Sequence, residues 1–177
     1  TLRRMVRETT LTPDDLILPL FVTYGKGVKK PITSMPGHSQ LSVDNIRKEA
    51  KEIKALGIPA VILFGIPEHK DEQGSDGWND EAPVQRAVKA IKKAWDDVVV
   101  MTDVCMCEYT DHGHCGVLDE HGCVRNDETL PLLARAALMP HCSSRATAIS
   151  MLTGLSSTIR IRRPASGLLW SENPPKA

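Results

Sequence analysis

The sequence predicts an α/β fold built on a parallel sheet. Three apolar segments of strand length, at residues 16–22, 58–65 and 98–102, alternate with segments in which apolar residues recur at helical spacing. Strands and helices that alternate in this way form parallel β-α units with right-handed connections. A closed barrel of eight such units takes about 250 residues. The chain has 177 residues and three predicted units, which are too few to close a barrel.

The first 15 residues form a separate N-terminal arm in this prediction. They begin with basic residues and end in a helical turn, for which Thr12 is the expected N-cap and Pro13 the first helical residue. The strand at residues 16–22 follows directly. It contains Pro19, which a barrel strand can tolerate at an edge or a bulge.

Two amphipathic helices connect the three predicted strands. After a loop at residues 23–40, Ser42 is the expected N-cap of the first helix, and Gly57 lies just beyond its end. Its predicted buried face consists of Val43, Ile46, Ala50 and Ile53. A long polar loop at residues 66–80 precedes the second helix, which ends near Trp95. Its predicted buried face consists of Val84, Ala87, Val88 and Ile91.

The third strand leads into a run of polar residues, 103–116, that contains three cysteines, two histidines and three carboxylates. This run begins at the carboxyl end of a predicted parallel strand, which is the edge where α/β folds place their active sites. The loop at residues 66–80 is expected at the same edge. The sequence therefore predicts a functional site here.

The three cysteines of this run, Cys105, Cys107 and Cys115, predict a metal centre. Thiolates are soft ligands that favour zinc over magnesium or calcium. Three protein ligands with one free position are typical of a catalytic zinc, and either His112 or His114 could instead supply a fourth ligand. The alternative is that the cysteines are reduced thiols without a metal. The third cysteine, the flanking glycines and the preceding strand favour the metal.

The pattern changes in the last part of the chain. A hairpin is predicted at residues 119–124, where we expect no metal ligand, and a further helix follows it. The apolar face of that helix consists of Leu130, Leu133, Ala134 and Ala137. After Leu138 no periodic pattern continues, and residues 139–177 carry five basic side chains and one acidic side chain. We interpret residues 139–177 as an irregular, divergent tail that arises from a frameshift or an alternative exon. The alternative is a functional tail, such as a basic segment that binds a partner.

Composition excludes several classes of protein. Acidic and basic residues are equal in number, 22 of each, which gives no indication of nucleic-acid or membrane-surface binding. No apolar run is long enough to span a bilayer, and the N-terminus does not have the pattern of a signal peptide. The odd number of cysteines, five, favours a reducing compartment over a disulfide framework.

Residues 103–116 also resemble the zinc loop of the porphobilinogen synthase (5-aminolevulinate dehydratase) family. The resemblance covers about residues 2–138, and residues 34–37, 63–65 and 84–87 support it. It implies a (β/α)8 TIM barrel, of which this chain would hold the first three strands, in residues 16–138, after an N-terminal arm. The family's arm embraces a neighbouring subunit, commonly in a homo-octamer.

The resemblance implies an activity and a set of site residues. The family is a lyase that condenses two molecules of 5-aminolevulinate to porphobilinogen, early in haem and other tetrapyrrole synthesis. Cys105, Cys107 and Cys115 match its zinc ligands, and Asp103 matches an active-site carboxylate. Magnesium is a secondary ion in some relatives. The expected location is the cytoplasm, or the plastid in a photosynthetic eukaryote.

The chain departs from the family where the covalent chemistry should lie. The family's two Schiff-base lysines are on later strands, which residues 139–177 do not resemble, and we expect every lysine before residue 139 to be a solvated surface residue. An imine with the substrate needs a desolvated lysine. We therefore expect the chain to be inactive alone. The alternatives are a non-catalytic zinc-binding or subunit-docking fragment and a nonfunctional translation product.

Overall fold

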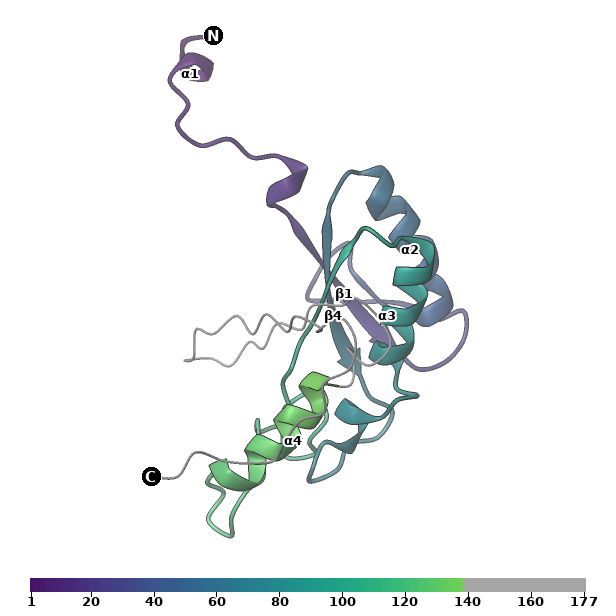
Figure 1. Ribbon diagram of the computed structural model, residues 1–177, viewed down its shortest axis with the longest axis vertical. Helices are drawn as coiled ribbons and strands as arrows, with labels where there is room; N and C mark the ends of the chain where they lie inside the picture. Colours follow the sequence, from purple (N-terminus) through teal and green to yellow (C-terminus); the bar gives the residue numbers. More distant parts are fainter. Residues whose placement is uncertain (139–177) are drawn as a thin grey trace, which may run out of the picture.

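The computed structural model describes residues 1–138, so the tail predicted at residues 139–177 lies outside the described residues. These residues form a five-stranded sheet and four α-helices (Figure 1). The strands are β1 (Ile17–Thr23), β2 (Lys29–Pro31), β3 (Ser39–Ser42), β4 (Ala60–Ile66) and β5 (Val99–Thr102). The helices are α1 (Leu2–Met5), α2 (Val43–Ala55), α3 (Pro83–Ala94) and α4 (Asn126–Leu138), with 3-10 turns η1 (Pro13–Asp15) and η2 (Ser75–Trp78).

The three predicted strands are confirmed as β1, β4 and β5. They lie side by side and parallel, with β4 in the middle. β1 and β4 pair along their whole length, from Ile17 opposite Ala60 to Thr23 opposite Ile66. Because the three strands run in the same direction, the loops that follow β4 and β5 leave the sheet at the same edge.

The loop predicted at residues 23–40 is partly wrong, because it contains two further strands. β3 pairs parallel with the last three residues of β1, and β2 pairs antiparallel with β3. All three residues of β2 are exposed, so no alternation of apolar and polar residues marks it in the sequence. The order of the described sheet is β2-β3-β1-β4-β5, which is open at both ends. A parallel α/β sheet is thus confirmed, whereas closure into a barrel is not.

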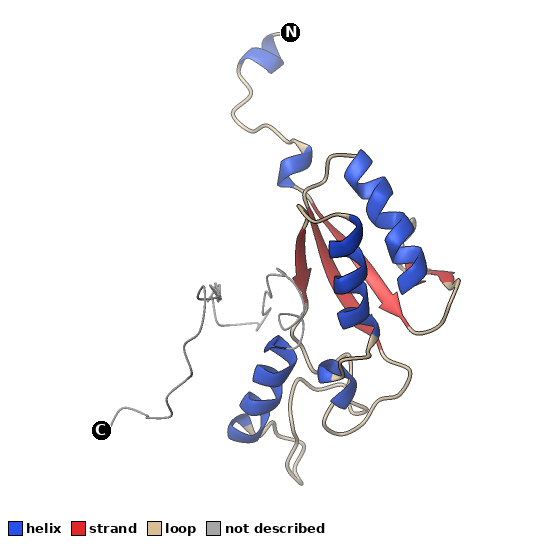
Figure 2. Cartoon of the chain, turned by 45° about the vertical axis from the view of Figure 1, so that its right-hand side comes forward, coloured by secondary structure: helices blue, strands red, loops and turns tan. Residues whose placement is uncertain are grey.

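Helices α2 and α3 cover one face of this sheet, as Figure 2 shows. Both were predicted, and their buried faces contain the expected residues apart from Val43, which is only partly buried. Alternate strand residues, such as Val22, Leu63 and Val100, point into the same core. Gly57 has a φ of 74° just after α2, which is the left-handed conformation that favours glycine at the end of a helix.

The predicted buried face of α4 is partly wrong. Leu133 is buried as expected, but Leu130 and Ala134 are exposed, and the helix instead buries Thr129 and Ala136. Thr129 can be buried because its hydroxyl accepts a hydrogen bond from the Val117 N–H and donates one to a backbone carbonyl. The helix packs through this face against the loop after β5 and against η2.

Residues 1–15 extend away from the sheet (Figure 1). Every residue of this segment is exposed, including four large apolar side chains: Leu2, Met5, Val6 and Leu11. The predicted turn at its end is confirmed as η1, where the Asp15 carboxylate accepts hydrogen bonds from the Thr12 N–H (2.8 Å) and hydroxyl (3.0 Å). None of the helices in residues 1–138 has the length and apolar character needed to cross a membrane.

Candidate metal centre

The loop after β5 places the three predicted cysteines together. Val104 and Met106 alternate with the thiols along the chain and are buried against α4. The Met106 carbonyl then accepts hydrogen bonds from the N–H groups of Tyr109 and Thr110, both at 2.9 Å, so the chain turns back directly after Cys107. Buried apolar residues thus fix the backbone on either side of Cys105.

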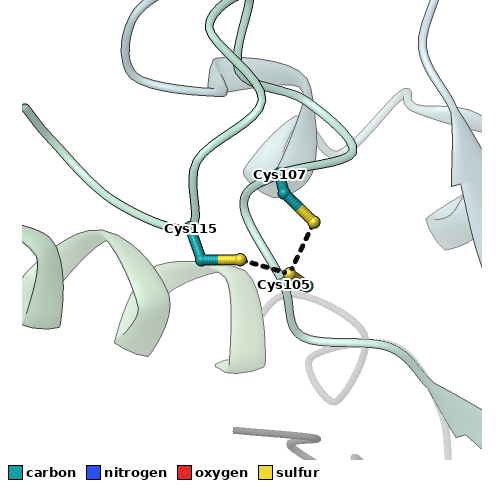
Figure 3. Close-up of side chains that lie close together, drawn as sticks. All are labelled: Cys105, Cys107 and Cys115. Carbon is teal, nitrogen blue, oxygen red and sulfur yellow. Dashed lines mark hydrogen bonds between the residues drawn. The ribbon is translucent and has the colours of Figure 1, made fainter. Parts of the chain in front are cut away.

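The three sulfur atoms converge on one point, as Figure 3 shows. The Cys105 Sγ lies 3.0 Å from the Cys107 Sγ and 3.1 Å from the Cys115 Sγ. All three sulfur atoms lie within 4.8 Å of one another, and they form the one such group of potential ligands found in residues 1–138. Cys115 is exposed and the other two thiols are half-buried, so an ion could reach the group from solvent.

The two histidines of the loop lie outside this group. His112 Nδ1 accepts a hydrogen bond from the His114 N–H at 3.1 Å, which leaves the proton of the neutral ring on Nε2. That nitrogen lies 3.3 Å from the Glu72 carbonyl and donates to it. Both ring nitrogens of His112 therefore have protein partners. Cys123, in the confirmed hairpin after the loop, is exposed and also lies outside the group.

Two carboxyl groups lie beside the thiols. Burial raises the pKa of Asp103 above its ordinary value. Burial, together with the charge of Asp103 and a hydrogen bond with it, raises the pKa of Glu108 to about 8. The negative charge of Asp103 therefore disfavours the ionised form of Glu108. Asp103 was predicted as a site residue, but Glu108 was not, because only the folded loop brings it against Asp103.

The environments of the three thiols differ. Burial raises the pKa of Cys105 and of Cys107 above that of a free thiol. Burial acts on Cys115 in the same direction, but hydrogen bonds from the other two cysteines outweigh it and lower the pKa of Cys115. Cys115 is therefore the thiol that most readily becomes a thiolate, which is the form that binds a metal.

The loop between β4 and α3 lies against the thiol loop, at the edge where it was predicted. The two loops are joined by hydrogen bonds from the Asp71 N–H to the Tyr109 carbonyl (3.3 Å) and from the Asp111 N–H to the Asp71 carbonyl (3.1 Å). The lysines of residues 1–138 are not buried at the site, although the charge of Lys70 acts on Glu108 from the exposed part of this loop. All are exposed except Lys92, which is half-buried and donates to the backbone carbonyls of Asp96 and Val98, between α3 and β5.

The fold and the site define an α/β protein with a mainly parallel sheet. Three convergent thiols, which could hold a metal ion, lie at the carboxyl edge of that sheet, where such folds place their active sites. Comparison with known proteins identifies the family. The sequence profile of delta-aminolevulinic acid dehydratase matches residues 1–158, and the chain belongs to this enzyme family.

Individual relatives agree with this assignment. Delta-aminolevulinic acid dehydratase of Synechocystis is 57% identical over 140 residues, which cover 77% of this chain and 43% of the relative. The Synechococcus elongatus protein of the same name is 51% identical over 180 residues, which cover 98% of this chain and 54% of the relative. The chain thus spans about half the length of the curated relatives it matches.

A solved structure also matches the fold. Porphobilinogen synthase from Toxoplasma gondii, in complex with the reaction product porphobilinogen, superposes with a TM-score of 0.79 at 34% identity. The match covers 85% of this chain and 43% of the T. gondii chain.

The comparisons correct one boundary of the sequence analysis. Resemblance to the family was predicted to end at about residue 138, whereas the family match continues to residue 158. The alignment with the S. elongatus relative extends over nearly the whole chain. Leu138 is therefore not the point at which similarity to the family ends.

Proposed function

We propose that this chain is the metal-binding part of a delta-aminolevulinic acid dehydratase, in which Cys105, Cys107 and Cys115 hold zinc beside Asp103. The observation that carries the proposal is the convergence of three thiols at the carboxyl edge of the sheet. The reaction is the condensation of two 5-aminolevulinate molecules to porphobilinogen, as the names of the relatives suggest.

The donor set fits zinc better than magnesium. Zinc binds thiolate sulfur, whereas magnesium prefers oxygen ligands, so magnesium would be at most a secondary ion elsewhere. Three thiolates leave one position open for a substrate oxygen or nitrogen. When bound there, zinc would supply Lewis-acid polarisation of the second substrate.

The carboxyl groups of Asp103 and Glu108 would transfer protons next to this ion. Burial and the charge of Asp103 raise the pKa of Glu108 to about 8, which is suited to a group that exchanges a proton with a substrate near neutral pH. The burial of the pair supports this role, since Asp103 Oδ1 and Glu108 Oε2 are both shielded from solvent.

The covalent half of the reaction needs a desolvated lysine, which residues 1–138 do not contain. We therefore propose that the chain forms no porphobilinogen alone. A second candidate function, a metal-binding fragment that docks on other subunits through its arm, is favoured by the four exposed apolar side chains in residues 1–15. In this second proposal, the subunits on which the arm docks are those of the family's homo-octamer.

Borohydride trapping tests whether the chain can form a covalent imine with the substrate. The chain is incubated with zinc and 5-aminolevulinate and then reduced, and mass spectrometry locates any modified lysine. We expect no stoichiometric adduct and no porphobilinogen. An adduct on any lysine, together with turnover, would show that the chain contains a complete site.

A further inference from the structure

Tyr109 lies in a slot that three glycines line. The side chain is 7% exposed. A Cβ added at Gly65 would collide with the Tyr109 hydroxyl and approach the Val84 Cγ2 to 2.9 Å. At Gly77 it would approach the Tyr109 ring at 3.1 Å, and at Gly74 the Tyr109 Cβ at 3.1 Å. The Tyr109 side chain is therefore enclosed at its hydroxyl end, along one side of the ring and at its Cβ.

The glycines of the slot are attached to the sheet and to α3. Gly65 is part of β4, paired with Val22 of β1, and the loop after it is tied to the sheet and to α3. The Tyr24 hydroxyl at the end of β1 donates to Asp76 Oδ1 at 2.5 Å. The Gln85 side chain, 3% exposed, donates from Nε2 to the Gly77 carbonyl at 3.2 Å.

The backbone around Tyr109 determines where the thiol loop turns. Its N–H donates to the Met106 carbonyl at 2.9 Å, which closes the turn that carries Cys107. The Thr110 hydroxyl, on the next residue, donates to the His114 carbonyl at 2.8 Å, directly before Cys115. Tyr109 thus lies between the two parts of the loop that must bring their sulfur atoms together.

We propose that Tyr109 is a positioning residue of the metal centre, whose enclosed ring sets the separation of Cys107 and Cys115. The inference rests on the proposed metal-binding function. Buried Val104 and Met106 hold the loop on either side of Cys105. The ring of Tyr109 holds it between Cys107 and Cys115, because a ring packed on glycines cannot shift without collision. Residues that orient metal ligands typically change metal affinity by about 10- to 100-fold when they are replaced.

The test compares four variants of the full chain: Tyr109→Ala, Tyr109→Phe, Gly65→Ala and Gly65→Ala/Tyr109→Phe. Zinc affinity is measured by competition with a chromophoric chelator. A second, metal-free readout is the rate at which phenylarsine oxide bridges two thiols of the reduced protein, counted by mass spectrometry. Ile91→Ala is the matched control, because Ile91 is 0% exposed in α3 and outside the slot.

We expect Tyr109→Ala to weaken zinc binding about tenfold or more and to slow arsenical bridging, while Tyr109→Phe retains both properties. Gly65→Ala should weaken both, and the double variant should recover part of the loss because it removes the hydroxyl nearest the new methyl group. Ile91→Ala should lower the melting temperature and leave both thiol readouts unchanged.

Wild-type values of both readouts for Tyr109→Ala would overturn the inference, as would an equal effect of Ile91→Ala. If the wild-type chain binds no zinc, the proposed function fails, and the arsenical readout alone then decides the role of Tyr109. If Tyr109→Ala does not fold, the comparison of Gly65→Ala with Gly65→Ala/Tyr109→Phe decides whether Tyr109 positions the thiols.

Discussion

Replacing Leu63 with alanine should destabilise the sheet that carries the candidate site. Leu63 is 0% exposed, in the middle of β4, and packs between the strands and the helices α2 and α3. The substitution removes three carbon atoms, worth about 2.4 kcal/mol at roughly 0.8 kcal/mol for each buried methylene. The cavity adds to this loss, so we expect about 3 to 4 kcal/mol in the free energy of unfolding.

Urea denaturation followed by circular dichroism measures this change. With a slope of roughly 1.5 kcal/mol per molar urea, the midpoint should fall by about 2 M. Leu130→Ala is the matched control, because Leu130 is 59% exposed on α4, and we expect it to change stability by less than about 0.5 kcal/mol. Equal midpoints for the two variants would show that β4 is not the centre of the core.

Two further predictions concern the thiols. Cys115→Ala should weaken zinc binding strongly in a chelator competition. Cys123→Ala, which removes an exposed cysteine outside the group, should bind zinc as the wild type does. An equal loss of zinc affinity in the two variants would contradict the assignment of Cys115 as a ligand. Zinc affinity should rise with pH, because burial raises the pKa of Cys105 and of Cys107 and both thiols must lose their protons to bind. We expect about a tenfold gain per pH unit for each proton released, measured by titration at several pH values, and a pH-independent affinity would refute the thiolate ligands.

The sequence predicts well those helices and strands that contribute several apolar residues to the core. β1, β4 and β5 are apolar runs in which alternate residues pack against α2 and α3, and α2 and α3 show the helical period because one side of each faces the sheet. β2 has no buried residue and hence no pattern. On α4, Thr129 is buried through hydrogen bonds to local partners, which hydrophobic spacing cannot indicate.

At the site, too, the sequence predicts some residues and not others. Spacing and chemistry are sufficient to predict Cys105, Cys107 and Cys115, which the structure brings together. Glu108 acquires its role through a contact with Asp103 that forms only in the folded loop, and Tyr109 through contacts with segments far away in the chain. Tyr109, for example, packs on Gly65. A single sequence carries no signal for a contact between residues so far apart.

The central claim is that the three thiols hold one zinc ion. X-ray absorption at the zinc edge, on the full chain loaded with one equivalent, tests it most directly. The account predicts three sulfur ligands at about 2.3 Å and one lighter ligand at about 2.0 to 2.1 Å. Replacing Cys105, Cys107 and Cys115 together with alanine should abolish the sulfur shell. A zinc shell of nitrogen and oxygen alone in the unaltered chain, or stoichiometric zinc retained by the triple variant, would contradict the claim.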